Sequence, residues 1–296
     1  MSSSVKAALT SNGLVTVAKV IGATVTGSAS MLAEAIHSGV DCANQLLLLF
    51  GSKQALKRET KDHPFGYGKE VYFWSFLVAI LLFSLGGLFS IYEGWHKLHD
   101  TTPLQNVGWA YGILIFAILM EGRSLGVCLK EIRAKYPGKT LRWFFKETRD
   151  TDLLVILGED AAALFGLVIA TLCLTLAVVT GNPMWDAVGS LLVGVLLCVV
   201  AVGLFVEIKA LLIGQSVAPD TRKRLYAFLA KRPEIEHTYE CMTMQMGPEA
   251  LVTIRARMRE VECAQKLIAD INVVEHALKQ EFPEFSWICF EPDNVL

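Results

Sequence analysis

The sequence predicts a membrane protein with an all-α domain of six transmembrane helices, followed by a small C-terminal α+β domain. The first observation is composition: 53% of the 296 residues are hydrophobic and only 19% are charged, whereas charged residues approach a quarter of an ordinary soluble domain. The second is a fall in apolar density near Val217. We therefore expect a helical domain at 1–214 and a second domain at 215–296.

Six segments are long and apolar enough for helices that cross a bilayer, which need about 20 such residues each. They cover approximately 6–26, 31–53, 71–97, 107–130, 152–179 and 184–213. Several of them carry ionisable or amide side chains, which are costly when they face lipid. We expect these side chains to face one another or a wet cavity: Asn12, Lys19, His37, Asp41, Glu121, Arg123, Asp152, Glu159 and Asp160.

The loops predict the orientation, because cytoplasmic loops hold an excess of lysine and arginine. The connections after the second and fourth helices are rich in these residues, while the segments TGSAS and TGNPMWD have none. We therefore expect a multi-pass integral protein with both termini in the cytoplasm. The expected location is a bacterial inner (cytoplasmic) membrane.

The C-terminal segment alternates helix and strand patterns. A helix is expected to begin at Pro219 and Asp220, with Asp220 as its N-cap. Residues 251–259 alternate apolar and polar side chains, which is typical of a strand with one buried face. With further strands at 237–246 and 285–291, a turn at Gly247 and an amphipathic helix around 267–278, the order is α-β-β-α-β. This order predicts a cytoplasmic, ferredoxin-like domain that is small enough for dimerisation to stabilise it.

Charge and cysteine content exclude other classes. A net charge of -2 gives no basic field for nucleic acid, so no nucleic-acid partner is expected. The seven cysteines show no C-x-x-C spacing, which argues against both a disulfide framework and a thiolate zinc cluster.

The second helix carries a polar stripe inside the predicted membrane. Its polar residues recur at spacings of four and three, which place them on one face: Ser30, Glu34, His37, Asp41 and Asn44. His37 and Asp41, one turn apart, offer an imidazole and a carboxylate to one point, a mixture that suits zinc and neighbouring metals.

The fifth helix is the best source of further ligands, because Asp160 lies near its middle. Glu159 lies about 100° around the helix from Asp160, so the two cannot aim at one metal. Pairing of Glu159 with Lys19 or Arg123 is the alternative. For Glu121 and Arg123, a packing network and a role in proton movement both stay open.

Four motifs then identify a resemblance that covers nearly the whole chain. TGSASMLAEAIHSGVD, DHPFGYGKE, EDAAALFG and TGNPMWDAVGSLLVG resemble the cation diffusion facilitator family, nearest to its zinc-transporter-nine branch. The resemblance implies a homodimeric metal–proton antiporter with an alternating-access site between the second and fifth helices. His37, Asp41 and Asp160 match the ligand positions of that family.

The chain departs from the family pattern at Ile156, where most members carry a histidine four residues before the aspartate. The site would then have three ligands, completed by water, Asn44 or a shifted Glu159. Without the histidine nitrogen, the ligand set consists mainly of oxygen atoms, and such a set binds Mn²⁺ or Fe²⁺ more readily. The loop histidine of the family matches His63, but its partner position is Tyr67, so no complete loop site is expected.

These observations predict a transporter in the lipid bilayer rather than an enzyme, with Zn²⁺ and protons as the transported species and efflux as the direction. Export of manganese, iron, cobalt or nickel by the same fold is an alternative. A membrane metal sensor or regulator that moves no ion is another, and Ile156 keeps it open. A channel is a third.

Overall fold

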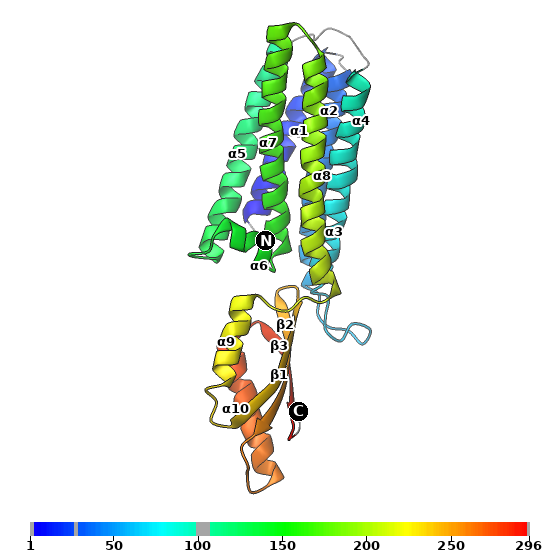
Figure 1. The fold of residues 1–296 in the computed structure, drawn as a ribbon. Coiled ribbons are helices and arrows are strands. Elements are labelled where there is room, and N and C mark those ends of the chain that lie inside the picture. The colour runs from blue at the N-terminus through cyan, green and yellow to red at the C-terminus, as the bar shows by residue number, and fades with distance from the viewer. Residues whose placement is uncertain (1–2, 27–28, 99–106, 295–296) are drawn as a thin grey trace.

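The computed structural model describes residues 3–26, 29–98 and 107–294; within them, the side chains of residues 3, 22–23, 25–26 and 29–37 lie outside the description. Figure 1 shows a long bundle of helices and, at one end of it, a smaller domain of strands and two helices. Helix α1 begins at the bundle end that faces this smaller domain, so both ends of the chain lie on the same side of the bundle.

The bundle consists of long helical rods over the apolar segments predicted from the sequence, together with the short helix α6. Its elements are α1 (Ser3–Thr26), α2 (Ala29–Ala55), α3 (Glu70–Leu81), the π-helical η1 (Leu82–Leu88), α4 (Phe89–Leu98), α5 (Val107–Lys135), α6 (Leu141–Glu147), α7 (Thr151–Thr180) and α8 (Met184–Ile213). The segments α3, η1 and α4 follow one another without a break and form one rod. Within the described residues, this rod and the helices α5, α7 and α8 are long and apolar enough to cross a membrane, while α1 and α2 pack in the same bundle.

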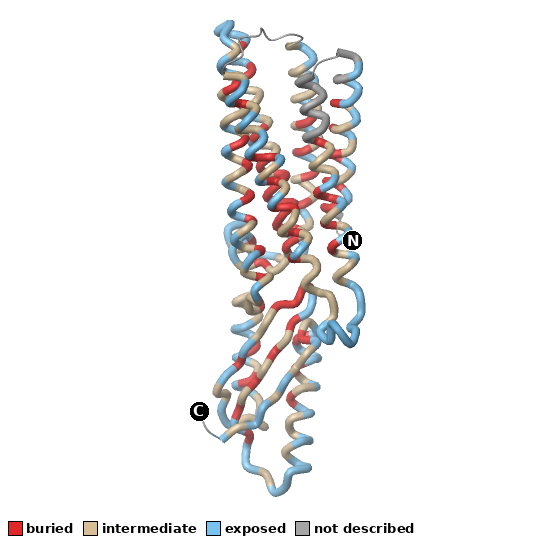
Figure 2. The backbone as a smooth tube through the Cα atoms, turned by 90° about the vertical axis from the view of Figure 1, so that its right-hand side faces the viewer, coloured by how far each residue is buried: buried red, intermediate tan, exposed pale blue. Residues whose placement is uncertain are grey.

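The outer surface of the bundle is apolar. On α8 the exposed side chains of Val195, Val199, Val202 and Val206 recur at helical spacing, and Figure 2 shows buried residues along the inside of the rods. Soluble monomers rarely expose apolar stripes of this extent. Since backbone groups in helices are satisfied within the helix, such a surface is suited to lipid.

The smaller domain is a three-stranded sheet with helices packed on it. Its elements are α9 (Pro219–Leu229), β1 (Ile235–Met246), β2 (Glu249–Met258), α10 (Ala264–Glu281) and β3 (Phe285–Pro292). The strand order is β1-β2-β3, with β1 and β2 antiparallel and β2 and β3 parallel. Val252, Ile254 and Ala256 point into the core with Leu225 and Leu278. The α/β character and the element order are as predicted, and the ferredoxin-like assignment stays a prediction.

Two local predictions need correction. Asp220 is not the N-cap of α9: that position is Ala218, and Pro219 occupies the first helical position, where its missing N–H costs nothing. Asp220 instead forms an ion pair with Lys139. The short helix α6 was not predicted, because basic residues obscure its pattern; Thr140 caps it by accepting a hydrogen bond from Trp143 N at 3.2 Å.

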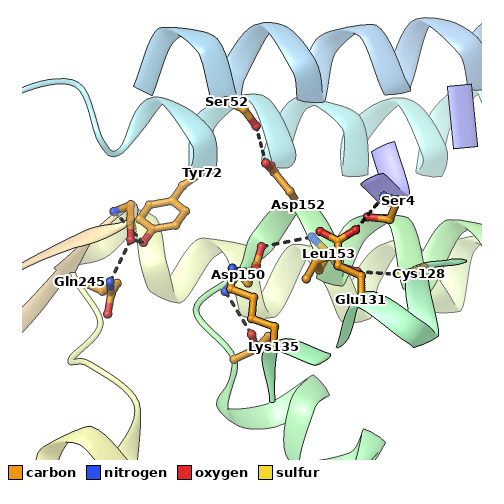
Figure 3. A network of polar contacts seen from close by, with 12 residues as sticks. Ser4, Ser52, Tyr72, Cys128, Glu131, Lys135, Asp150, Asp152, Leu153 and Gln245 are labelled. Atoms are coloured by element: carbon orange, nitrogen blue, oxygen red, sulfur yellow. Dashed lines mark hydrogen bonds and ion pairs between the residues drawn. The ribbon is translucent and has the colours of Figure 1, made fainter. Parts of the chain in front are cut away.

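The hairpin turn between β1 and β2 docks directly on the bundle (Figure 3). Tyr72, at the start of α3, is fully buried, and its hydroxyl accepts a hydrogen bond from Gly247 N at 2.9 Å. Gln245 Nε2 donates to Gly247 O at 2.9 Å and braces the turn. Gly68 and Gly247 pack backbone to backbone, so that a Cβ atom on Gly68 would overlap the carbonyl of Met246.

A second contact joins the two parts of the molecule beside α6. Arg149 Nε donates to Ser216 O at 2.8 Å, at the link between α8 and α9. Burial lowers the pKa of Arg149, although an arginine stays protonated in proteins. Together with the turn at Gly247, this contact fixes the smaller domain to the bundle at two points.

We predict that Gly68→Ala loosens the docked turn, because the added methyl group meets backbone that cannot rotate away. Overpacking of this kind costs about 1–3 kcal/mol. Thermal unfolding in detergent, with limited proteolysis of the segment 214–219, measures the effect. Gly203→Ala is the matched control, since nothing lies within 4 Å of a Cβ atom there. Equal stability of the two variants would contradict the prediction.

Candidate functional site

A buried carboxylate joins α2 to α7. Asn44 Nδ2 donates to Glu159 Oε1 at 3.0 Å, and Gln45 Nε2 donates to Glu159 Oε2 at 2.7 Å. Asn44 and Gln45 are fully buried and Glu159 is 4% exposed. Each carboxylate oxygen therefore has an amide donor, which is the condition under which a buried charge is tolerated. We call Asn44, Gln45 and Glu159 the amide clamp.

The neighbouring acid faces a different helix. Asp160 is 1% exposed, and its Oδ2 accepts a hydrogen bond from Ser124 Oγ on α5 at 2.7 Å. Adjacent residues on a helix are separated by about 100°, which turns Glu159 toward α2 and Asp160 toward α5. The alternative pairing of Glu159 with Lys19 or Arg123 is thus replaced by the amide clamp.

Further charges surround this pair of acids. Asp41 and Glu121 interact electrostatically with both Glu159 and Asp160, and Lys19 acts on Glu121. Glu121 and Lys19 are 7% and 8% exposed, so both point into the bundle as expected. The centre of the bundle is consequently acidic, with a lysine at its edge.

Arg123 departs from the expectation that every charged side chain of the rods faces inward, because it is exposed. The buried face of α5 follows helical spacing through Ala117, Glu121, Ser124, Cys128 and Ile132. Arg123 lies two residues after Glu121 and therefore about 200° around the helix. The structure thus places Glu121 inside the bundle and Arg123 on its surface, on different sides of α5.

Three oxygens at this centre lack hydrogen-bond partners. Among the described residues, no donor reaches the enclosed atoms Asn44 Oδ1, Gln45 Oε1 or Asp160 Oδ1. Buried polar atoms are nearly always satisfied by protein, water or an ion. Amide and carboxylate oxygens are ligands for divalent cations, and an oxygen-rich set favours the harder ones.

The structure brings together some of the predicted ligands. Asp41, half-buried, lies one turn before the amide clamp on α2, with Asp160 across the interface. His37 lies on α2, but its side chain is outside the described residues. In the described part of the chain, no three His, Cys, Asp or Glu side chains gather closely enough to hold a metal ion.

Ile156 occupies the position of the missing histidine and is fully buried in the bundle core, in the same cluster as Leu48. It lies one turn before Asp160 on α7. This level of the interface is therefore apolar. In the loop, the exposed ring of His63 stacks on Tyr67 with 4.4 Å between centroids.

Sequence reasoning missed Gln45 and Ser124. Ser124 had a signal, because it follows Glu121 by three residues on one helical face. The signal for Gln45 was weaker: it directly follows Asn44, but it lies about 100° around the helix from the polar stripe that contains Asn44. Only packing shows that α7 approaches between the two amides.

The fold and the site define a polytopic membrane protein with a buried, acidic, oxygen-rich centre between helices. Residues 5–213 match the family model described as the cation efflux transmembrane domain. The chain belongs to the cation efflux family, which confirms the resemblance identified from the motifs.

The relatives are named as transporters. Identity is 37% over 80% of the chain with the proton-coupled zinc antiporter SLC30A9 of Xenopus laevis, and 35% over 82% with that of Homo sapiens. Metal tolerance protein C4 of Arabidopsis thaliana is 33% identical over 74% of the chain. The zinc-transporter-nine branch is thus confirmed, and the relatives named here are transporters rather than enzymes. The chain spans 43% of the length of the two antiporters and 48% of the plant protein.

The predicted location needs correction. The antiporters of Xenopus laevis and Homo sapiens are mitochondrial proteins by name. Their similarity overturns the expected bacterial cytoplasmic membrane, which loop charges and hydropathy have no means of identifying. The apolar rods still support an integral membrane protein.

We predict that Gln45→Leu destabilises the bundle, because Glu159 Oε2 loses its donor and stays buried. Leaving a buried acceptor without a donor costs about 1–3 kcal/mol. Thermal unfolding followed by circular dichroism in detergent measures the loss. Gln54→Leu makes the same chemical change near the end of α2. If both variants unfold at the same temperature, the amide clamp does not stabilise the α2–α7 interface.

Proposed function

We propose that this chain transports Zn²⁺ in exchange for protons, at a site between α2 and α7. The observation that carries the proposal is the buried acidic centre around Glu159 and Asp160, with three enclosed oxygens that lack partners. Charged groups at this depth are costly and are retained for function. The names of the relatives support zinc as the ion and protons as the counter-ion.

The proposed ligands are His37, Asp41 and Asp160. For the fourth position, Asn44 Oδ1 is favoured over Glu159, because both oxygens of Glu159 already accept amide hydrogen bonds. Water is the other candidate. One nitrogen and three oxygens form a harder set than a zinc site rich in histidine, so Mn²⁺ or Fe²⁺ can compete.

Proton exchange follows from the chemistry of these ligands. A metal binds the deprotonated carboxylates and the neutral imidazole, so metal and protons compete for the same atoms. His37 suits this competition, since imidazole titrates near neutral pH. Alternating access requires α2 and α7 to separate on one side at a time, and the amide clamp lies on the interface that would open.

For the whole protein, we propose six membrane spans in residues 1–214 and a dimerising domain in 215–296. The described helices support six spans, because α1 and α2 pack in the same bundle as the four more apolar rods, namely α3–η1–α4, α5, α7 and α8. Helices α9 and α10 pack on the three-stranded sheet, whose outer strands β1 and β3 both lie at an edge. A second copy of the chain could bind there.

Two other functions have some support. Export of Mn²⁺, Fe²⁺, Co²⁺ or Ni²⁺ fits the oxygen-rich centre. A metal sensor that moves no ion fits the apolar Ile156, which removes a ligand that most of the family uses. Flux separates the sensor from the exporters, because a sensor binds metal without moving it.

We predict that purified chain in proteoliposomes takes up zinc in response to an imposed pH gradient. Since removing even a partner of a metal ligand costs about 10–100-fold in affinity, Asp160→Asn should lower the flux at least about tenfold. Asp186→Asn is the control: this acid lies in the first turn of α8 and pairs with Lys97 at 3.5 Å. Uptake that ignores the gradient, or that survives His37→Ala with Asp41→Ala, would exclude the proposal.

A second prediction concerns metal choice. Ile156→His should shift the preference toward zinc in a competition among zinc, manganese, iron, cobalt and nickel, because it restores an imidazole ligand. Ile156→Leu controls for the change of packing in the core. If the histidine variant keeps the metal preference of the original chain, Ile156 does not set selectivity.

A further inference from the structure

A second polar contact crosses the α2–α7 interface below the amide clamp. Ser52 Oγ, near the end of α2, donates a hydrogen bond to Asp152 Oδ2 in the first turn of α7 (Figure 3). The other oxygen, Asp152 Oδ1, is enclosed and has no hydrogen-bond partner among the described residues. Asp152 thus has one donor for two oxygens, whereas Glu159 has two.

The two contacts lie at different depths. Ser52 follows Asn44 by eight residues, and Asp152 precedes Glu159 by seven, or roughly 10–12 Å along each helix. The lower contact lies toward the smaller domain, since α7 starts at that end of the bundle (Figure 1). Buried apolar side chains separate the two levels, namely Leu48 of α2 with Val155 and Ile156 of α7.

Few charges act on Asp152. Asp150, at the N-cap of α7, and Lys135, at the end of α5, both interact with it, but Lys135 Nζ is already paired with Asp150 Oδ2 at 2.5 Å. Beyond them, Arg149 interacts with Tyr72 of α3 and Glu207 of α8. The charge of Asp152 is therefore compensated mainly by the Ser52 hydroxyl.

The chemistry of this pair suits a proton better than a metal ion. One carboxylate and one hydroxyl are too few ligands for a divalent cation. A proton needs a single oxygen, and Asp152 Oδ1 is free to take it. Asp152 is half-buried in the first turn of α7, at the end of the bundle that faces the smaller domain, and this position gives a short route to water.

We propose that Asp152 is a proton-binding site that works together with the transport centre. This inference rests on the proposed zinc–proton exchange. When the centre is empty, Asp152 takes a proton from water on the side of the smaller domain and forms one O–H bond. When zinc loads from that side, this bond breaks and the proton returns to the same water.

The coupling is mechanical. Ser52 and the two amides belong to α2, while Asp152 and Glu159 belong to α7. When the centre is empty and α2 and α7 stand apart, the Ser52–Asp152 hydrogen bond is lengthened, and the carboxylate, having lost its donor, holds a proton. Zinc bound between α2 and α7 draws the two helices together, so the Ser52 hydroxyl donates to the Asp152 carboxylate again and the proton leaves.

Zinc flux in proteoliposomes, measured against pH on the side of the smaller domain, tests the site. By linkage, the slope of the logarithm of apparent zinc affinity against pH counts the protons released. We expect Asp152→Asn to lower this slope by about one, a loss of about tenfold per pH unit, with zinc still transported. Asp186→Asn should leave the slope unchanged, whereas Ser52→Ala keeps the Asp152 carboxylate but removes the donor through which the coupling acts, and should also lower the slope.

An unchanged slope in Asp152→Asn overturns the proton site while leaving zinc transport intact; absence of flux in the unmodified chain overturns the proposed function instead. If Asp152→Asn does not fold, the exchange Ser52→Asp with Asp152→Ser moves the carboxylate across the same interface. That variant should keep the slope, and a slope lower by about one would also overturn the proposal.

Discussion

The burial of Glu159 between α2 and α7 is the constraint on which the rest of the bundle depends. A carboxylate at this depth is tolerated only if its oxygens have donors, and Asn44 and Gln45 supply one to each. These bonds fix how α2 rotates and how far it slides along α7. The same rotation turns Asp160 toward Ser124, and Asn44 Oδ1, Gln45 Oε1 and Asp160 Oδ1 are enclosed without a hydrogen-bond partner among the described residues.

The α2–α7 interface alternates between polar and apolar levels. The amide clamp forms the upper level and the Ser52–Asp152 contact the lower one, with Leu48 and Ile156 packed between them. An apolar level excludes water and keeps the two polar levels apart. Such layering is what a transporter needs if its centre is to open to one side at a time. It also gives Ile156 a structural role at a position where the resemblance to the family predicted a ligand.

The smaller domain is tied to the helix pair next to this interface. Tyr72, at the start of α3, holds the turn at Gly247, and Arg149, just before α7, holds Ser216. Both attachments lie at the bundle end where α7 begins. The smaller domain is thus joined to α3 and to the start of α7 by direct hydrogen bonds as well as by the chain connection after α8.

The sequence by itself determined the two-part architecture, the helical segments and the α-β-β-α-β order, because hydropathy and its period depend on local residue order. It also identified Asp160 and the polar face of α2 as unusual, and the motifs identified the family. The predicted location in a bacterial membrane was wrong, since no local sequence pattern identifies the cellular compartment of a membrane protein.

Only the tertiary structure decided which side chains form hydrogen bonds with the buried acids. Spacing along one helix cannot say which neighbour an acid meets, so Glu159 bonding to Gln45, Asp160 bonding to Ser124 and Asp152 bonding to Ser52 required the packing of α2, α5 and α7. The same holds for Arg123, whose exposure follows from how α5 is rotated in the bundle. Pairing across helices depends on rotation and depth, which packing fixes and local sequence does not.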